Sequence, residues 1–245
     1  MGSMTAVGKE LQRLDYFTTD DADEENLPGK ILDKYPYWNE RFYKVVVGYD
    51  FAEKILVPDA LYKYEDAETL LNAGFGTGVH TTIIAEPVAE KHLHTIFRMP
   101  TAIYEWAAMK LTNVQYFHTV SLLLKKNDDG DKNLLRVDIK SETFSVLVFK
   151  EGKLLLAQSR EYSSPEDVLY YLLKITEQFS LSQQDIRLIL SGLIEEESTL
   201  YRELYKYFIH LEFEHIPEGI KPDAVFSEHP AHYFSSLLNL AACVL

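Results

Sequence analysis

Two histidines, His92 and His94, have the residue type and spacing that come nearest to a metal site. Side chains two positions apart in a strand lie on one face of the sheet, and imidazole is a common zinc ligand. A third ligand would have to come from elsewhere, such as Glu86 or Glu90, and no pattern marks either carboxylate. We therefore favour a pair of strand histidines on a solvent-facing surface and predict no metal site.

A glycine-rich segment at residues 74–82, GFGTGVHTT, is the second stretch with chemical potential. Its glycines are spaced as in loops that bind dinucleotides. It also resembles the FGTG-x-H-x-TT segment of the protein methyltransferases that modify a ribosomal protein. Against both readings, it follows a predicted helix instead of a strand, and no D-x-G-x-G-x-G loop lies downstream. We predict a flexible loop and no cofactor.

The other residues that could carry chemistry are each explained by a structural role. His229 and His232 flank Pro230 at a predicted helix start, where a capping role is enough. Cys243 lies on an apolar helix face and is predicted to be buried and inert. The acidic run at residues 20–25 suits a solvated helix start, because acids favour the positive end of the helix dipole. No Ser-His-Asp or Cys-His arrangement has a recognisable local motif.

The composition narrows the classes of partner. The 245 residues carry 38 acids and 24 bases, a formal net charge of −14, which argues against nucleic acid or an anionic membrane as the main partner. A single cysteine allows no intrachain disulfide, so the reducing cytoplasm is the expected compartment. No apolar stretch approaches the roughly 20 residues that span a bilayer. Residues 1–3, ahead of Met4, look like a cloning remnant and are left out of the predicted fold.

The elements that must position any site are clearest from Asn133 to Tyr162, NLLRVDIKSETFSVLVFKEGKLLLAQSREY. Apolar and polar residues alternate around Val137 as they do in a half-buried strand, and the next run is apolar on both faces, as in a central strand. Glu151-Gly152 makes a two-residue turn in which glycine can take a positive φ. We therefore predict three consecutive antiparallel strands.

Helices and strands alternate after these three strands. Ser164-Pro165-Glu166-Asp167 is a strong helix start, with a serine cap, proline in the first turn and two acids. The predicted order is β-β-β-α-β-α-β-α, which implies a mixed sheet covered by helices. Before residue 127 the predicted elements follow a shortened version of that order. They are strands at 9–19, 42–49, 53–58, 80–87, 93–99 and 114–118, and helices at 24–35, 59–61, 65–73, 101–111 and 120–126.

The second-half order is that of a ribonuclease-H-like unit, and the chain resembles the actin-like ATPase superfamily, in which two such units face each other across a nucleotide cleft. More closely it resembles an uncharacterised bacterial family within it. The resemblance covers nearly all of the chain after Lys9. It is carried by YSSPEDVLYYLLKITEQF, LILSGLIEEESTLYREL, HPAHYFSSLLNLAAC, LVP and IIAEPV, and by the "VDI…T…VFK-G-KL" wording shared with pilus-assembly and cell-division members.

That resemblance implies a domain organisation. The fold class is α/β with mixed sheets, in two ribonuclease-H-like subdomains of actin-like ATPase architecture. We expect a first half at residues 4–126, truncated at its N-terminus, a polar linker at 127–132 and a second half at 133–245.

The resemblance also implies a nucleotide site, from which this sequence departs. Active members carry a D-x-G-G-G-T turn, whereas this chain has Asp138, Thr143 and, between them, Ile139-Lys140-Ser141-Glu142. Side chains there would crowd phosphates, and Glu142 would repel them. The adenosine-side turn keeps only Gly192 of its usual glycine pair or triplet. Degenerate nucleotide contacts are thus expected at Asp138, Ser141, Thr143 and Gly192, with no catalytic residue.

These departures favour a non-catalytic module that binds another protein. Plentiful aromatic and acidic residues, 16 Tyr among them, suit a protein–protein surface, and a homodimer is an alternative arrangement. The alternative function is a nucleotide-dependent ATPase, kinase-like enzyme or switch with an altered phosphate pocket. A small-molecule binder without nucleotide chemistry is the third reading.

Overall fold

In the computed structural model, the described residues are 1–4, 11–15, 27–39, 42–111, 113–125, 133–220 and 229–242. The chain divides into two compact units. Unit 1 comprises Met1, Leu14–Lys126 and Asn239–Leu245, and unit 2 comprises Gly2–Arg13 and Asn127–Leu238. The domain boundaries expected from the sequence stay a prediction, and the expected linker lies outside the described residues.

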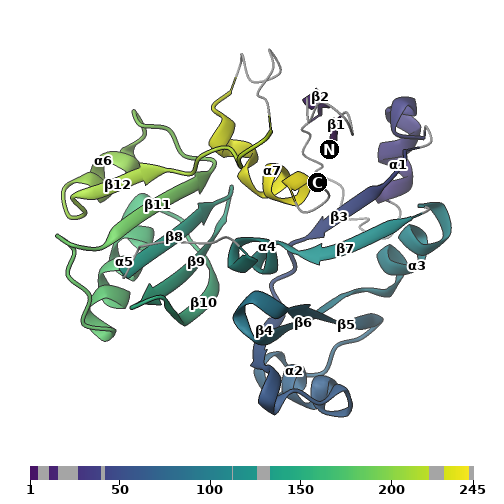
Figure 1. The fold of residues 1–245 in the computed structure, drawn as a ribbon, viewed down its shortest axis with the longest axis horizontal. Coiled ribbons are helices and arrows are strands. Elements are labelled where there is room, and N and C mark those ends of the chain that lie inside the picture. The colour runs from purple at the N-terminus through teal and green to yellow at the C-terminus, as the bar shows by residue number, and fades with distance from the viewer. Residues whose placement is uncertain are drawn as a thin grey trace. The chain divides into compact units, whose positions relative to one another are not determined.

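A five-stranded mixed sheet forms the centre of unit 2. Its strands are β8 (Asn133–Ile139), β9 (Thr143–Lys150), β10 (Lys153–Glu161), β11 (Arg187–Gly192) and β12 (His210–Phe213), in the order β10-β9-β8-β11-β12. The first three pair antiparallel, whereas β11 is parallel to both β8 and β12. The predicted three-strand meander is confirmed, and so is β9 as a strand buried between two neighbours (Figure 1).

The local signals read from the sequence form the turns and caps of this unit. Glu151 and Gly152 both take positive φ, 51° and 74°, so the turn between β9 and β10 has the twist that a hairpin requires. Helix α5 (Pro165–Gln178) starts with proline, and Asp167 Oδ2 accepts a hydrogen bond from the Ser164 N–H at 2.9 Å. That contact satisfies a backbone donor that the helix cannot satisfy itself.

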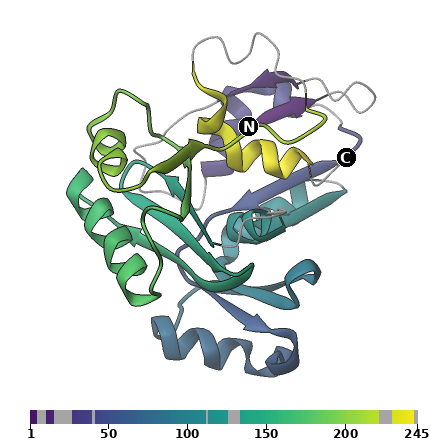
Figure 2. The same cartoon turned by 60° about the vertical axis from the view of Figure 1, so that its left-hand side comes forward.

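Helices α5 and α6 (Thr199–Tyr205) cover one face of the sheet, as Figures 1 and 2 show. From α5, Val168, Leu172 and Ile175 are fully or almost fully buried against the inward-facing residues of β8, β9 and β11. Leu200 and Leu204 of α6 and Phe208 complete this core. Its residues recur at helical spacing in the helices and at every second position in the strands. After β12 the chain continues with the 3-10 helix η7 (Ala231–Phe234) of unit 2 and with α7 (Ser235–Ala242), which is assigned to unit 2 up to Leu238 and to unit 1 from Asn239.

Strands β3 to β7, in the described part of unit 1, lie in two small sheets. Strands β3 (Val45–Tyr49) and β7 (Val114–His118) pair in parallel. Strands β4 (Lys54–Pro58), β5 (Thr81–Val88) and β6 (Leu93–Pro100) form an antiparallel sheet in the order β4-β6-β5. The predicted order of elements is present, but the sequence did not indicate which strands share a sheet.

The helices of unit 1 pack on these sheets. Leu71 of α2 (Ala67–Phe75) is fully buried against Ile96 of β6 and Val57 of β4. Ile103 of α3 (Thr101–Lys110) packs on the cluster of Tyr49, Phe97 and Met99. The remaining elements are α1 (Leu27–Lys34), α4 (Thr119–Lys125) and the 3-10 helices at Pro36–Asn39, Asp59–Leu61, Tyr64–Asp66 and Ala89–Lys91. Strands β1 (Gly2–Met4) and β2 (Leu11–Leu14) form a two-stranded sheet that belongs to unit 2 except for Leu14, so the residues set aside as a cloning remnant are partly in a strand.

Several local expectations need correction. Helix α2 ends at Phe75 and not at residue 73 as predicted, and its C-cap is Gly76 with a φ of 78°. His92 does not lie in a strand, because it takes a φ of 52° at the turn before β6. The strand expected at 9–19 is described only at Leu11–Leu14. Cys243 and the acidic run at 20–25 lie outside the described residues.

Candidate functional site

The expected nucleotide-contacting residues gather at the carboxyl ends of β8 and β11 in unit 2. These parallel strands are adjacent, and the register places Asp138 opposite Ser191 and Ile139 opposite Gly192. The chain leaves β8 toward β9 on one side and enters β11 by a crossover on the other. Ligands of open α/β sheets bind at such switch points. The candidate site is therefore defined here as Asp138, the turn at Lys140–Thr143, Ser191 and Gly192.

Asp138 is tied to the neighbouring strand. Its side chain is buried, and its Oδ1 accepts a hydrogen bond from Ser191 Oγ at 2.7 Å. Burial raises the pKa of the Asp138 carboxyl, the Ser191 hydrogen bond opposes this rise, and the charge of Glu214 adds to it. Burial therefore disfavours the charged form of this carboxyl. Sequence reasoning expected Asp138 at the site, but it missed Ser191 as its partner.

Replacing Asp138 by asparagine should change the pH dependence of stability. A raised pKa means that the folded state holds the proton over a pH range in which the unfolded state has lost it. Stability contributed by the neutral carboxyl is present in acid and is lost as pH rises through the folded pKa. The free energy of unfolding of the wild type minus that of Asp138→Asn should therefore fall from pH 4 to pH 7 in urea titrations. If this difference in the free energy of unfolding stays constant or rises over that pH range, the pKa of Asp138 is not raised in the folded protein.

The turn between β8 and β9 folds without glycine. None of Lys140, Ser141 and Glu142 takes a positive φ, and the Lys140 N–H donates to the Thr143 carbonyl at 2.8 Å. Tyr162 secures the turn from β10's end, because its hydroxyl donates to the Lys140 carbonyl at 2.6 Å and its N–H donates to the Glu142 carbonyl at 3.0 Å. Ser141 and Glu142 are exposed, and burial lowers the pKa of Lys140 to about 8. The turn is thus a closed, tyrosine-supported structure that presents side chains.

Gly192 is required by close packing between β11 and β8. It has a φ of 80°, and a β-carbon at this position would lie 2.0 Å from the Ile139 carbonyl oxygen. That same carbonyl accepts a hydrogen bond from the Leu193 N–H at 2.7 Å, while the Ile194 N–H donates to the Gly192 carbonyl at 2.9 Å. Phosphate loops work by turning backbone N–H groups toward the ligand. Here the N–H groups of Lys140, Leu193 and Ile194 donate to the chain's own carbonyls.

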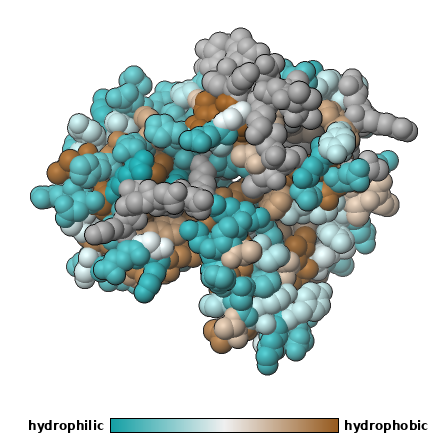
Figure 3. Space-filling model, viewed as in Figure 1, coloured by the Kyte–Doolittle hydropathy of each residue, from teal (hydrophilic) through white to brown (hydrophobic). Residues whose placement is uncertain are grey.

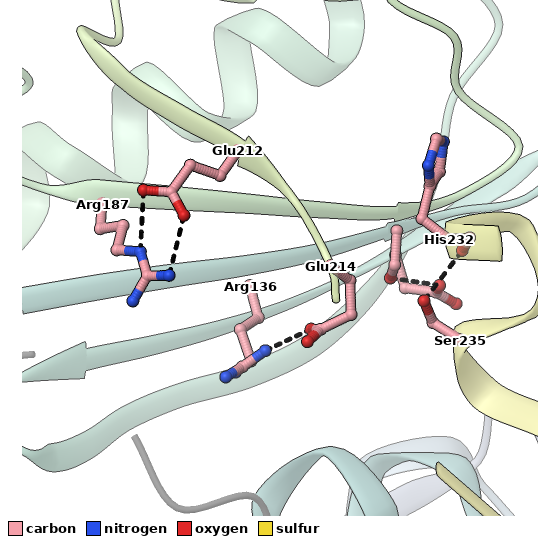
Figure 4. A network of polar contacts seen from close by, with 8 residues as sticks. Arg136, Arg187, Glu212, Glu214, His232 and Ser235 are labelled. Atoms are coloured by element: carbon pink, nitrogen blue, oxygen red, sulfur yellow. Dashed lines mark hydrogen bonds and ion pairs between the residues drawn. The ribbon is translucent and has the colours of Figure 1, made fainter. Parts of the chain in front are cut away.

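Charged side chains run along the sheet face that carries Asp138. Figure 4 shows Arg136 of β8 bonded to Glu214 and Arg187 of β11 facing Glu212 of β12. The second pair has two contacts, Nε to Oε1 at 3.1 Å and Nη2 to Oε2 at 2.8 Å. The Arg136 and Glu214 side chains are only 8% and 10% exposed, so each charge is stabilised by the other. Sequence alternation predicted charge on this face of β8, but the partners lie 78 positions apart.

The glycine-rich segment of unit 1 wraps around a buried arginine. Arg98 of β6 donates from Nη1 to the Gly76 carbonyl at 2.8 Å and to Glu53 Oε2 at 2.8 Å, and from Nη2 to Asn72 Oδ1. A β-carbon on Gly78 would lie 2.9 Å from the Arg98 side chain. The segment was predicted to be a flexible loop, yet these contacts fix its start. Of its glycines, Gly78 packs closely against Arg98, whereas Gly76 takes a positive φ of 78° with open space around it.

The two histidines considered for metal binding do not share a strand face. His94 lies in β6, stacks on Tyr62 with ring centroids 3.8 Å apart and has Nδ1 2.9 Å from Asp59 Oδ1. His92 occupies the preceding turn. Within the described ranges, no three His, Cys, Asp or Glu side chains come together as metal ligands. His232, expected to cap a helix, instead stacks on Phe213 and contacts the Ile194 carbonyl through Nε2 at 2.7 Å.

His118 of unit 1 is a fully buried titratable residue that sequence reasoning did not single out. Its Nε2 lies 3.0 Å from the Phe51 carbonyl, and its Nδ1 accepts a hydrogen bond from the Val120 N–H at 3.1 Å. These partners fit the neutral ring with its proton on Nε2. Burial, and then the charge of Lys54, lower the pKa of His118 to about 4, against the hydrogen bond to Phe51.

Acid should therefore destabilise the wild type through His118. The unfolded chain takes up a proton near pH 6.5, whereas the folded chain resists until about pH 4. This contribution should be complete above pH 6.5 and should fall by about 3 kcal/mol between pH 6.5 and 4. His118→Asn keeps an acceptor for Val120 and cannot titrate, so its urea-unfolding profile should lack this fall. If the stability of both proteins changed with pH in the same way, His118 would not be the group that destabilises the wild type in acid.

Comparisons with known proteins identify the fold. Residues 9–211 match the model of a family described as "Protein of unknown function (DUF3822)". A Bacteroides thetaiotaomicron protein with actin-like ATPase fold and unknown function superposes with a TM-score of 0.75 at 19% identity, covering 93% of this chain and 86% of that one. A chain of the PilM-PilN type IV pilus biogenesis complex superposes with a TM-score of 0.63 at 14% identity, covering 96% of this chain and 91% of that one. No match was found among curated proteins.

These likenesses confirm the expected fold class. The chain is a mixed α/β protein with several sheets, and it has the actin-like ATPase fold expected from its sequence. At these identities the likeness concerns the fold alone, since unrelated activities share a fold. Among the described residues, no helix is long and apolar enough to cross a membrane.

Proposed function

This chain belongs to the family described as "Protein of unknown function (DUF3822)" and has the actin-like ATPase fold, and we propose that it is a non-catalytic module that binds another protein. The observation that carries the proposal is the closed phosphate-side turn. Its Lys140 N–H, and those of Leu193 and Ile194 beside it, donate to carbonyls of the chain itself. A phosphate would have to displace these three bonds before the same N–H groups could hold it.

Asp138 supports the same proposal. A carboxyl that anchors a nucleotide-bound cation must be ionised and accessible. Burial favours the neutral form of Asp138, and Ser191 occupies Oδ1. A nucleotide that contacted Ser141, Thr143 and Gly192 would meet the side chains of the turn and the close packing of Gly192 on Ile139. Under this proposal these residues maintain the fold.

The partner is proposed to be a protein. The structurally similar PilM was solved in complex with PilN, so a chain of this fold can act through a protein partner. The net charge of −14 disfavours nucleic acid, and the single cysteine fits the reducing cytoplasm as the proposed compartment.

Isolation of the intact chain from its native host tests the proposal. Mild chemical crosslinking followed by native mass spectrometry should give a complex with a different polypeptide. A chain recovered only as a monomer or a homodimer would contradict protein binding of the proposed kind. Nucleotide retained through the same isolation would favour the altered-pocket ATPase or switch instead.

A further inference from the structure

An aromatic column crosses the surface of unit 2 from α6 to η7. Tyr205 stacks on Tyr201 with ring centroids 6.2 Å apart, Tyr201 stacks on Phe213 at 5.3 Å, and Phe213 stacks on His232 at 4.1 Å. The interplanar angles are 15°, 18° and 11°, so the four rings are nearly parallel. The inner end is buried at His232, whereas Tyr205 is 64% exposed at the outer end.

Two further exposed hydrophobic residues follow Tyr205, the outer end of this column, in the chain. Tyr207 is 44% exposed and Ile209 is 63% exposed, both between α6 and β12. Figure 3 shows hydrophobic residues at the surface among hydrophilic ones in the region of α6 and β12. Ordered aromatic rings with exposed aliphatic neighbours have the composition of a protein-binding hot spot. Rings already stacked on one another also lose little side-chain freedom when a partner binds.

Three consecutive acids accompany the column. Glu195, Glu196 and Glu197 are exposed in the segment between β11 and α6. Glu195 Oε1 accepts a hydrogen bond from the Tyr233 hydroxyl at 2.6 Å. Burial, and next the charge of Glu196, raise the pKa of Tyr201. The negative charge of Glu196 therefore acts on a ring of the column. The nearby cation Lys206 is engaged by Glu203 at 2.6 Å.

We propose that the aromatic column and the three glutamates bind a segment of a partner protein that carries arginine or lysine next to an apolar anchor. The face of an aromatic ring attracts a guanidinium or ammonium group, and carboxylates beside it complement the same charge. Exposed Ile209 and Tyr207 offer contact to the anchor. This inference rests on the proposed function and names the chemistry of the partner.

A second copy of the chain is a poor occupant of this surface. A two-fold dimer brings the same patch of both chains together, so the three glutamates would face their copies. Like charges opposed across an interface oppose binding. Nucleic acid is disfavoured by the same carboxylates.

The test uses the full chain with p-benzoyl-phenylalanine in place of Tyr205, mixed with native-host extract and irradiated. Tyr170 of α5 is the matched control position, because it is also a helical tyrosine of unit 2 with 64% exposure. We expect an adduct with another protein at position 205 and none at 170, and the crosslinked peptide should contain arginine or lysine. A synthetic peptide of that sequence then serves as the probe.

Fluorescence anisotropy with this peptide should separate the variants. Tyr205→Ala and the triple change Glu195→Gln, Glu196→Gln and Glu197→Gln should each weaken binding at least about tenfold. Tyr170→Ala should stay within about twofold, and added NaCl should weaken wild-type binding. Circular dichroism of each variant confirms that it is folded.

Three outcomes would overturn the inference: an adduct peptide without basic residues, an adduct between two copies of the chain, or no adduct at position 205. The last leaves the proposed function standing if crosslinking of the isolated chain still yields a complex with a different polypeptide. Absence of any such complex would instead remove the proposed function itself.

Discussion

Gly192→Ala should remove most of the folding stability of unit 2. The added β-carbon would lie 2.0 Å from the Ile139 carbonyl oxygen, well inside van der Waals contact, and the φ of 80° is costly for alanine. Relief requires β11 to move away from β8 at the Leu193–Ile139 hydrogen bond. We expect a loss of more than about 4 kcal/mol in the free energy of unfolding, measured by urea titration.

Gly152→Ala is the matched control, because it separates conformation from crowding. Gly152 has a similar φ of 74°, but a β-carbon there would meet no atom within 4 Å. Gly152→Ala should therefore lose only about 1 kcal/mol of stability, the cost of a left-handed backbone conformation for alanine. If both variants lose the same free energy of unfolding, the close contact with Ile139 is not the reason that position 192 requires glycine.

Arg98→Leu should cost about 2 to 3 kcal/mol, because it removes a buried cation from three acceptors, of which the Glu53 side chain is 43% exposed and can be hydrated. Leucine leaves Glu53, the Asn72 side chain and the Gly76 carbonyl without their donor in a site where Arg98 itself is 3% exposed. Hydrogen exchange of the amides at residues 76–79 should accelerate as the loop loses its support. Thermal and urea unfolding measure the stability.

Arg160→Leu is the control for loss of a surface arginine. Arg160 is exposed on β10 and lies 4.9 Å above the Tyr171 ring, so its loss should cost no more than about 1 kcal/mol. A loss at Arg98 as small as that at Arg160, with unchanged exchange at residues 76–79, would show that the glycine-rich segment does not depend on Arg98.

The elements of unit 2 were predictable because their signals are local. Alternation in β8–β10, the Glu151-Gly152 turn and the start of α5 each depend on residues within a few positions of one another. Sheet membership in unit 1 was not predictable in the same way. Strand β3 pairs with β7, although three other strands lie between them in the chain, and alternation does not specify a partner.

The residues expected at the nucleotide site lie together at the ends of β8 and β11, but their contacts were not predictable. Ser191 meets Asp138 across 53 positions, and Gly192 is needed because Ile139 of another strand approaches it. The roles of Arg98 and His118 arise in the same way, from partners brought together by folding. His92 was misplaced because a histidine beside a strand pattern gives no signal of its positive φ. The nucleotide roles of Asp138, Ser141, Thr143 and Gly192 stay a prediction.

Isothermal titration of the full chain with Mg-ATP tests the central claim, loss of the nucleotide chemistry of the actin-like fold, most directly. We predict no heat of binding up to millimolar nucleotide and no phosphate release above the buffer rate. This follows from the backbone donors of Lys140, Leu193 and Ile194 being engaged within the chain. Binding in the micromolar range with measurable phosphate release, both abolished by Asp138→Ala, would contradict the claim and establish a nucleotide-dependent enzyme.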